Sequence, residues 1–221
     1  MRAAALGLAI IAAASSGCIW TYVDSVVLGV DGGTDGGPAA GSLEIQAEVM
    51  GWDGMERTVK AQVCGDLACL DLGESRVNAE GAVHFFASPP PASVNTHFPP
   101  AGCNATTAVV STPPDPGLGL LELRVFTNGL HTGWLVERTT SGPLGTGSAH
   151  GGQLFVRQSA HITGVWSCVD GATTHEFTAD LQLEPGWTAT LAEVTETPST
   201  VVKYNYRAGT DGRMKWYYVL R

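Results

Sequence analysis

The cysteines are the residues best spaced for chemistry, as disulfides or as metal ligands. The chain has five, and four of them lie after residue 60. Cys64 and Cys69 flank a tight turn where their sulfurs would meet, so we predict that they pair and that Cys103 pairs with Cys168. A zinc site is the alternative, but the C-x4-C spacing is wider than usual and no matching second pair follows. The four cysteines therefore indicate two disulfides formed in an oxidising compartment.

Motifs for catalysis or cofactor binding begin in this sequence but are not completed. His175-Glu176 starts an H-E-x-x-H zinc motif, but Ala179 stands where the second histidine belongs. Gly145-Thr146-Gly147 starts a dinucleotide fingerprint that lacks its third glycine, and no serine stands in G-x-S-x-G. We therefore predict a non-enzymatic protein with no catalytic residue, no cofactor and no metal. A hydrolase whose site is assembled from distant residues remains the less favoured alternative.

The histidines show no ligand spacing. His150 stands in a glycine-rich stretch, residues 141–152, which predicts a loop. We interpret His150 as a solvated loop residue because no ligand partner is spaced near it. His175 falls in an alternating stretch and is interpreted as an ordinary strand residue.

The aromatic residues near the C-terminus are the candidates for ligand binding. Residues 200–207 and 213–220 alternate in polarity and predict a terminal hairpin, in which Tyr204, Tyr206, Trp216 and Tyr218 share the core face. The alternative is that these rings are exposed and stack on sugars or peptides. Trp216 and Tyr217 are therefore the candidate ligand-binding residues, with Tyr217, beside Lys215, expected to be the most exposed ring.

The rest of the chain predicts an all-β fold. Gly (28) and Pro (12) are frequent, and strands with period-2 alternation begin at residue 42, where Leu43, Ile45, Ala47 and Val49 share one face. Asn128-Gly129 predicts a hairpin turn, and a proline-rich excursion over residues 89–117 needs an anchor, which Cys103 would provide. We expect about ten to twelve short strands in a disulfide-stapled antiparallel β-sandwich, immunoglobulin-like or jelly-roll-like.

A short resemblance supports the sandwich. Residues Leu183 to Trp187 resemble the strand–turn–aromatic corner of immunoglobulin-like domains, with Trp187 where that family often has Tyr. The resemblance covers five residues and implies a fold only. The folded body would span residues 42–221, as one unit or as two subdomains divided near residue 117.

The N-terminus has the anatomy of an export signal. Arg2 precedes an apolar run, Ala3–Ala14, that is too short to span a bilayer but has the length of a signal-peptide core. The following Ser15-Ser16-Gly17-Cys18 resembles the lipobox of bacterial lipoproteins. The resemblance implies that residues 1–17 are removed and that Cys18 carries the lipid. Ser15 stands where that family usually has Leu, which leaves secretion without a lipid as the alternative.

Lipidation of Cys18 also explains the odd number of cysteines, because it leaves four to pair. Residues 18–41 would then be a lipidated segment and a glycine-rich tether. Ile19, in place of the Asp typical of inner-membrane retention, favours the outer membrane in such lipoproteins.

These features define an expected function class. Twelve basic against 21 acidic residues give a net charge of −9, which argues against a nucleic-acid partner. We expect a lipid-anchored bacterial envelope protein that displays a binding or structural β domain to an unidentified protein or glycan. The alternative is a carbohydrate- or peptidoglycan-binding module that uses the C-terminal aromatics.

Overall fold

The computed structural model describes residues 41–64, 69–93, 96–100, 102–198 and 200–221. The described residues form fourteen strands and no helix, so the predicted all-β class is confirmed with more strands than expected. Nowhere in these ranges is there a helix with the length and hydropathy of a membrane span. The predicted signal peptide, Cys18 and the tether up to residue 40 lie outside the described residues.

The strands have the following bounds: β1 (Leu43–Met50), β2 (Arg57–Cys64), β3 (Cys69–Val77), β4 (Ala82–Ala87), β5 (Cys103–Ala105), β6 (Val110–Thr112), β7 (Gly119–Thr127), β8 (Leu130–Arg138), β9 (Ala149–Val156), β10 (Ala160–Asp170), β11 (Thr173–Leu183), β12 (Gly186–Glu196), β13 (Val201–Ala208) and β14 (Lys215–Leu220). They join in one mixed sheet whose main path is β4-β1-β14-β8-β7-β9-β12-β13-β11-β10-β5. Most pairs are antiparallel, as expected, but β1–β14 and β11–β13 are parallel.

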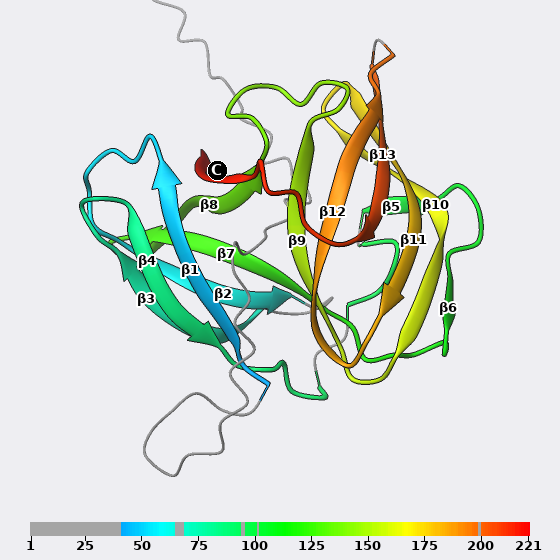
Figure 1. Cartoon of the computed structure of the whole chain (residues 1–221), viewed down its shortest axis with the longest axis horizontal. Helices are drawn as coiled ribbons and strands as arrows, with labels where there is room; N and C mark the ends of the chain where they lie inside the picture. Colours follow the sequence, from blue (N-terminus) through cyan, green and yellow to red (C-terminus); the bar gives the residue numbers. More distant parts are fainter. Residues whose placement is uncertain (1–40, 65–68, 94–95, 101, 199) are drawn as a thin grey trace, which may run out of the picture.

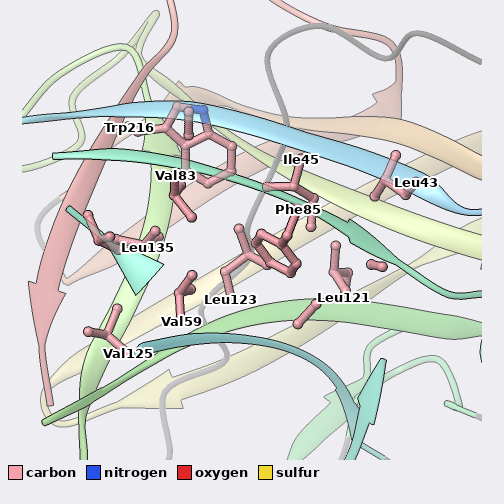
Figure 2. Close-up of a cluster of buried hydrophobic side chains, with 14 of the residues drawn as sticks. Leu43, Ile45, Val59, Val83, Phe85, Leu121, Leu123, Val125, Leu135 and Trp216 are labelled. Carbon is pink, nitrogen blue, oxygen red and sulfur yellow. The ribbon is translucent and has the colours of Figure 1, made fainter. Parts of the chain in front are cut away.

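The sheet has two halves, each curled around its own core (Figure 1). The first half contains β1–β4, β7, β8 and β14. Figure 2 shows side chains of β1 and β4, such as Ile45 and Phe85, pointing toward those of β2 and β7, such as Val59 and Leu123. The buried residues of β1 are every second one, as its alternation predicts. Two layers of strands thus enclose the first core.

The second half contains β5, β6 and β9–β13. Its core is centred on Trp166, which is fully buried, stacks on Phe177 at 5.5 Å between ring centroids and meets Tyr206 edge-on at 6.0 Å. Since β5 and β6 belong to this half while β14 belongs to the first, neither half is one continuous segment. The division of the body near residue 117 stays a prediction.

The two cores lie on opposite faces of the sheet, and β7 shows where the change occurs. Leu121 pairs with Val63 and is buried in the first core, whereas the preceding Leu120 pairs with Leu154 and is buried in the second. Successive strand residues point to opposite faces. The outward face of the first half is therefore continuous with the inward face of the second.

One predicted hairpin is confirmed and one is wrong. Asn128 and Gly129 have positive φ angles of 52° and 79° in the turn that joins β7 to β8, as the Asn-Gly signal predicts. Gly171 turns β10 back onto β11. The predicted terminal hairpin does not form, because β13 pairs with β11 and β12 while β14 pairs with β1 and β8. Alternation predicted both strands but says nothing about their partners.

Both predicted disulfides are present, between Cys64 and Cys69 and between Cys103 and Cys168. The first joins the ends of β2 and β3. The second joins β5 to β10, where the two cysteines are register partners. Since β6 also pairs with β10, the proline-rich excursion is fixed to the second half, as its dependence on Cys103 predicted. Disulfides are consistent with an exported protein.

Candidate functional site

The two predicted ligand-binding residues lie on opposite faces of β14. Trp216 is 3% exposed and packs in the first core, so its ring cannot meet a ligand in the folded protein. Tyr217 faces the other way and is partly exposed, next to the exposed Met50 on β1. A candidate site must therefore be built from Tyr217 and its neighbours on the outward face.

The outward face of the first half carries aromatic side chains across three adjacent strands. On β8, Leu135 is buried in the core, so Trp134 points outward. Trp134 lies opposite Arg124 of β7 and Val219 of β14, and Tyr217 lies two residues before Val219 on β14. Trp134 and Tyr217 are both partly exposed.

Two more rings extend this surface toward the β7–β8 turn. His131 pairs with Phe126, and its ring lies 5.5 Å from that of Phe126 and 4.6 Å, edge-on, from that of Trp134. Both rings are partly exposed. We call these residues together the aromatic face: Phe126, His131, Trp134 and Tyr217.

The backbone around Gly133 brings these rings together. The β7–β8 register shifts between Val125 and Phe126, and this irregularity places His131 beside Phe126. A Cβ on Gly133 would lie 2.2 Å from the carbonyl oxygen of Val219 and 2.7 Å from the Tyr218 ring. Only glycine therefore allows β8 and β14 to approach closely here.

Charged groups flank the aromatic face. Arg124 donates to Glu122 at 2.7 Å and to the Cys64 sulfur at 3.2 Å, so the β2–β3 disulfide supports its position. Lys60 lies 5.6 Å from the centre of the Phe126 ring. Burial and the Arg124 charge lower the pKa of His131, against the effect of its bond to the Gly133 carbonyl. His131 therefore adds a neutral polar ring at neutral pH.

The histidines differ from expectation in one case. His150 does not lie in a solvated loop: it is in β9, is 9% exposed and contacts Tyr204. The glycines on both sides predicted a loop, but Gly151 and Gly152 pair with β12 as ordinary strand residues. His175 is a strand residue of β11, as predicted. Within the described ranges, no three His, Cys, Asp or Glu side chains are grouped to hold a metal ion.

Sequence reasoning missed Phe126, His131 and Trp134. The signal for Phe126 was available, because the alternation that buries Leu123 and Val125 points it outward. No local pattern relates Phe126 to Tyr217, because Tyr217 lies on a strand that is far away in the sequence. No family model matches this chain, and no curated protein or solved structure shows significant similarity to it.

Proposed function

We propose that this protein is an exported, non-catalytic carbohydrate-binding protein of the bacterial envelope. The observation that carries the proposal is the aromatic face, on which partly exposed rings lie on three adjacent strands of one sheet surface. We further propose that a lipid on Cys18 holds the protein at a membrane, the outer one by preference.

Ring stacking explains how such a face would hold a sugar. Aromatic rings present an apolar surface that packs against the C–H groups of a pyranose, and their polar edges bond to its hydroxyls. Trp134 would supply the largest stacking surface. Arg124, whose guanidinium is already fixed by Glu122, would donate hydrogen bonds beside it. A rigid sheet loses little conformational freedom when it binds.

Export and anchoring rest on the cysteines. Two disulfides account for four of the five. The remaining one, Cys18, follows an apolar run that resembles a lipoprotein signal, and a thioether-linked lipid would use its thiol. Two or more acyl chains suffice for stable membrane attachment.

The glycan proposal is tested by co-sedimentation of the full chain with insoluble peptidoglycan, chitin and cellulose in mild detergent. We expect retention on at least one of them and a loss of about tenfold in affinity for Trp134→Ala, the size of one lost stacking contact. Phe86→Ala is the matched control, because Phe86 is also an exposed strand aromatic, at 39%, but lies on β4.

Two results would contradict glycan binding: no retention on any of the polymers, or the same loss in the Phe86 and Trp134 variants. Trp216→Ala is unsuitable as a test, because it would open a cavity in the first core and reduce binding through unfolding. Circular dichroism of each variant confirms that it is folded.

Anchoring is tested separately by intact-mass and peptide mass spectrometry of protein taken from its native membranes. We expect an N-terminal peptide that begins at Cys18 and carries acyl mass. A peptide that begins near Gly17 without a lipid would refute the anchor and indicate secretion instead.

A further inference from the structure

A second polar cluster lies where the outward face of β8 meets the interior of the second half. Arg138 of β8 and His150 of β9 are direct register partners, which places their side chains on one face with Cβ atoms about 5 Å apart. The His150 ring meets the Tyr204 ring edge-on at 5.3 Å. The Tyr204 hydroxyl lies 3.0 Å from Nδ1 of His175. We call these four residues the arginine–histidine cluster.

Two members of the cluster have buried polar atoms without partners. His150 is 9% exposed, and its Nε2 makes no hydrogen bond. The Nε of Arg138 is likewise buried and unbonded, and among the described residues no carboxylate forms an ion pair with this guanidinium. Buried polar groups are normally bonded, and an unpaired one destabilises the folded protein. Neither atom therefore has a hydrogen-bond partner among the described residues.

The cluster has an uncompensated positive charge. Burial lowers the pKa of Arg138, but a guanidinium stays protonated at neutral pH. Burial raises the pKa of Tyr204 to about 12, so the phenol is neutral, and burial with the Arg138 charge lowers the pKa of His150 to about 3. Burial also lowers the pKa of His175, against a weaker opposite effect of Asp170. None of these groups offsets the charge of Arg138.

We propose that the arginine–histidine cluster binds an oxyanion, the carboxylate or phosphate group of a ligand. The Arg138 guanidinium presents a planar set of donors suited to two oxygens, and Nε2 of His150 supplies a further donor from the side. An anion would compensate the half-buried charge and satisfy both unbonded atoms. This site is separate from the aromatic face and does not depend on glycan binding.

Tyr204 and His175 act as positioning residues. The Tyr204 hydroxyl and Nδ1 of His175 share a hydrogen bond of 3.0 Å, which fixes both rings. The Tyr204 ring in turn holds the His150 ring on its edge. The donors of Arg138 and His150 are thereby held in place before any anion arrives.

Isothermal titration calorimetry of the full chain with sodium phosphate, sulfate and acetate, at constant ionic strength, tests the proposal. We expect saturable one-to-one binding of at least one anion. Preference for acetate would indicate a carboxylate ligand, and preference for phosphate or sulfate a tetrahedral one. Arg138→Gln should weaken binding about 10- to 100-fold, the effect of losing a charge-assisted bond.

Arg207→Gln is the matched control, because Arg207 lies on β13, the strand that carries Tyr204, but faces Glu193 at 4.0 Å. It should bind the anion as the wild type does. An equal loss in both variants would show a nonspecific charge effect and overturn the site, as would the absence of saturable binding to all three anions.

A readout on the wild-type chain covers the case in which Arg138→Gln does not fold. A bound anion favours the protonated form of His150, so proton uptake should accompany binding. We expect the His150 C–H resonances to show a raised pKa with the anion present and the affinity to increase as pH falls from 8 to 5.5. Resonances and affinity that do not change would refute the role of His150.

Discussion

Two arginines lie near tyrosine side chains, Arg57 in the first half and Arg138 at the junction of β8 with the second half, and their charges are compensated differently. In the first half, the Arg57 guanidinium lies 4.8 Å from the centres of both the Trp52 and Tyr218 rings. It also donates to both oxygens of Asp53, at 2.9 and 2.5 Å. Where β8 meets the second half, Arg138 lies near Tyr204, and no carboxylate among the described residues forms an ion pair with it.

The difference teaches how to interpret a buried arginine in this fold. Arg57, with a side chain only 6% exposed, has its charge neutralised by a nearby residue of the same chain. Burying a charge is costly unless it is paired. The charge of Arg57 is paired with Asp53, although its Nε is unbonded like that of Arg138, whereas the charge of Arg138 is left for the proposed ligand. The first arginine therefore has a structural role and the second a binding role.

The halves also differ in their disulfides, and removing a disulfide should give the largest expected change in the free energy of unfolding. Cys64 and Cys69 are 5 residues apart, and Cys103 and Cys168 are 65 apart. Loop-closure entropy predicts that replacing Cys103 and Cys168 by Ala costs about 4 kcal/mol, against about 2 kcal/mol for Cys64 and Cys69. Urea unfolding of the two double variants measures this difference. Equal costs would show that the excursion is held by its strands rather than by its disulfide.

Removing each arginine in turn tests the contrast in charge directly. Arg57→Met should cost about 2 kcal/mol, because it loses a paired set of charge-assisted bonds and leaves Asp53 alone. Arg138→Met should stay within about 0.5 kcal/mol of the wild type or be more stable, because it removes an unpaired, half-buried charge. Chemical denaturation in low-phosphate buffer gives both values. A large loss for Arg138→Met would mean that its charge is already compensated within the chain.

Acid should weaken the two halves in different pH windows. The pKa of His150 is about 3 when folded and about 6.5 when unfolded, so the unfolded chain binds the extra proton between these values. Stability is then lost as pH falls below 6.5, by about 2 kcal/mol between pH 7 and pH 5. The bond from Arg57 lowers the pKa of Asp53 below 3.8, so that contribution is lost only under more acidic conditions.

The measurement is the free energy of unfolding from pH 7 to pH 4.5 for the wild type and His150→Leu. The variant should show a shallower dependence. Burial also lowers the pKa of His131 and His175, so some dependence remains and the difference between the two proteins is the test. Identical slopes would place the His150 ring in contact with water.

The alternation of apolar and polar residues predicted much of this fold, because alternation indicates which side chains are buried. The alternation around Tyr204, Tyr206 and Trp216 correctly placed all three side chains inside. The prediction of a terminal hairpin was wrong because the alternation within a strand does not depend on which strand pairs with it. A turn at residues 208–212 suits a hairpin, yet β14 joins the other half, where it pairs with β1 and β8. Strand partners depend on contacts far apart in sequence.

The candidate sites were less predictable for the same reason. Arg138, His150, His175 and Tyr204 come from four strands, and no spacing along the chain relates them. The glycines beside His150 also concealed its strand, since glycine is rare in strand interiors. Tyr217 was identified because its neighbours on β14 alternate with it.

The place of β14 in the sheet has a consequence for the order in which the strands can pair during synthesis. Among the described strands it is the last along the chain, yet it lies between the first, β1, and β8. A ribosome would therefore release β1 and β4 long before β14, the strand that links β1 to β8 in the sheet. Until β14 emerges, β1 lacks its pairing to this strand and the first core lacks Trp216. The half of the molecule that begins first is thus completed last.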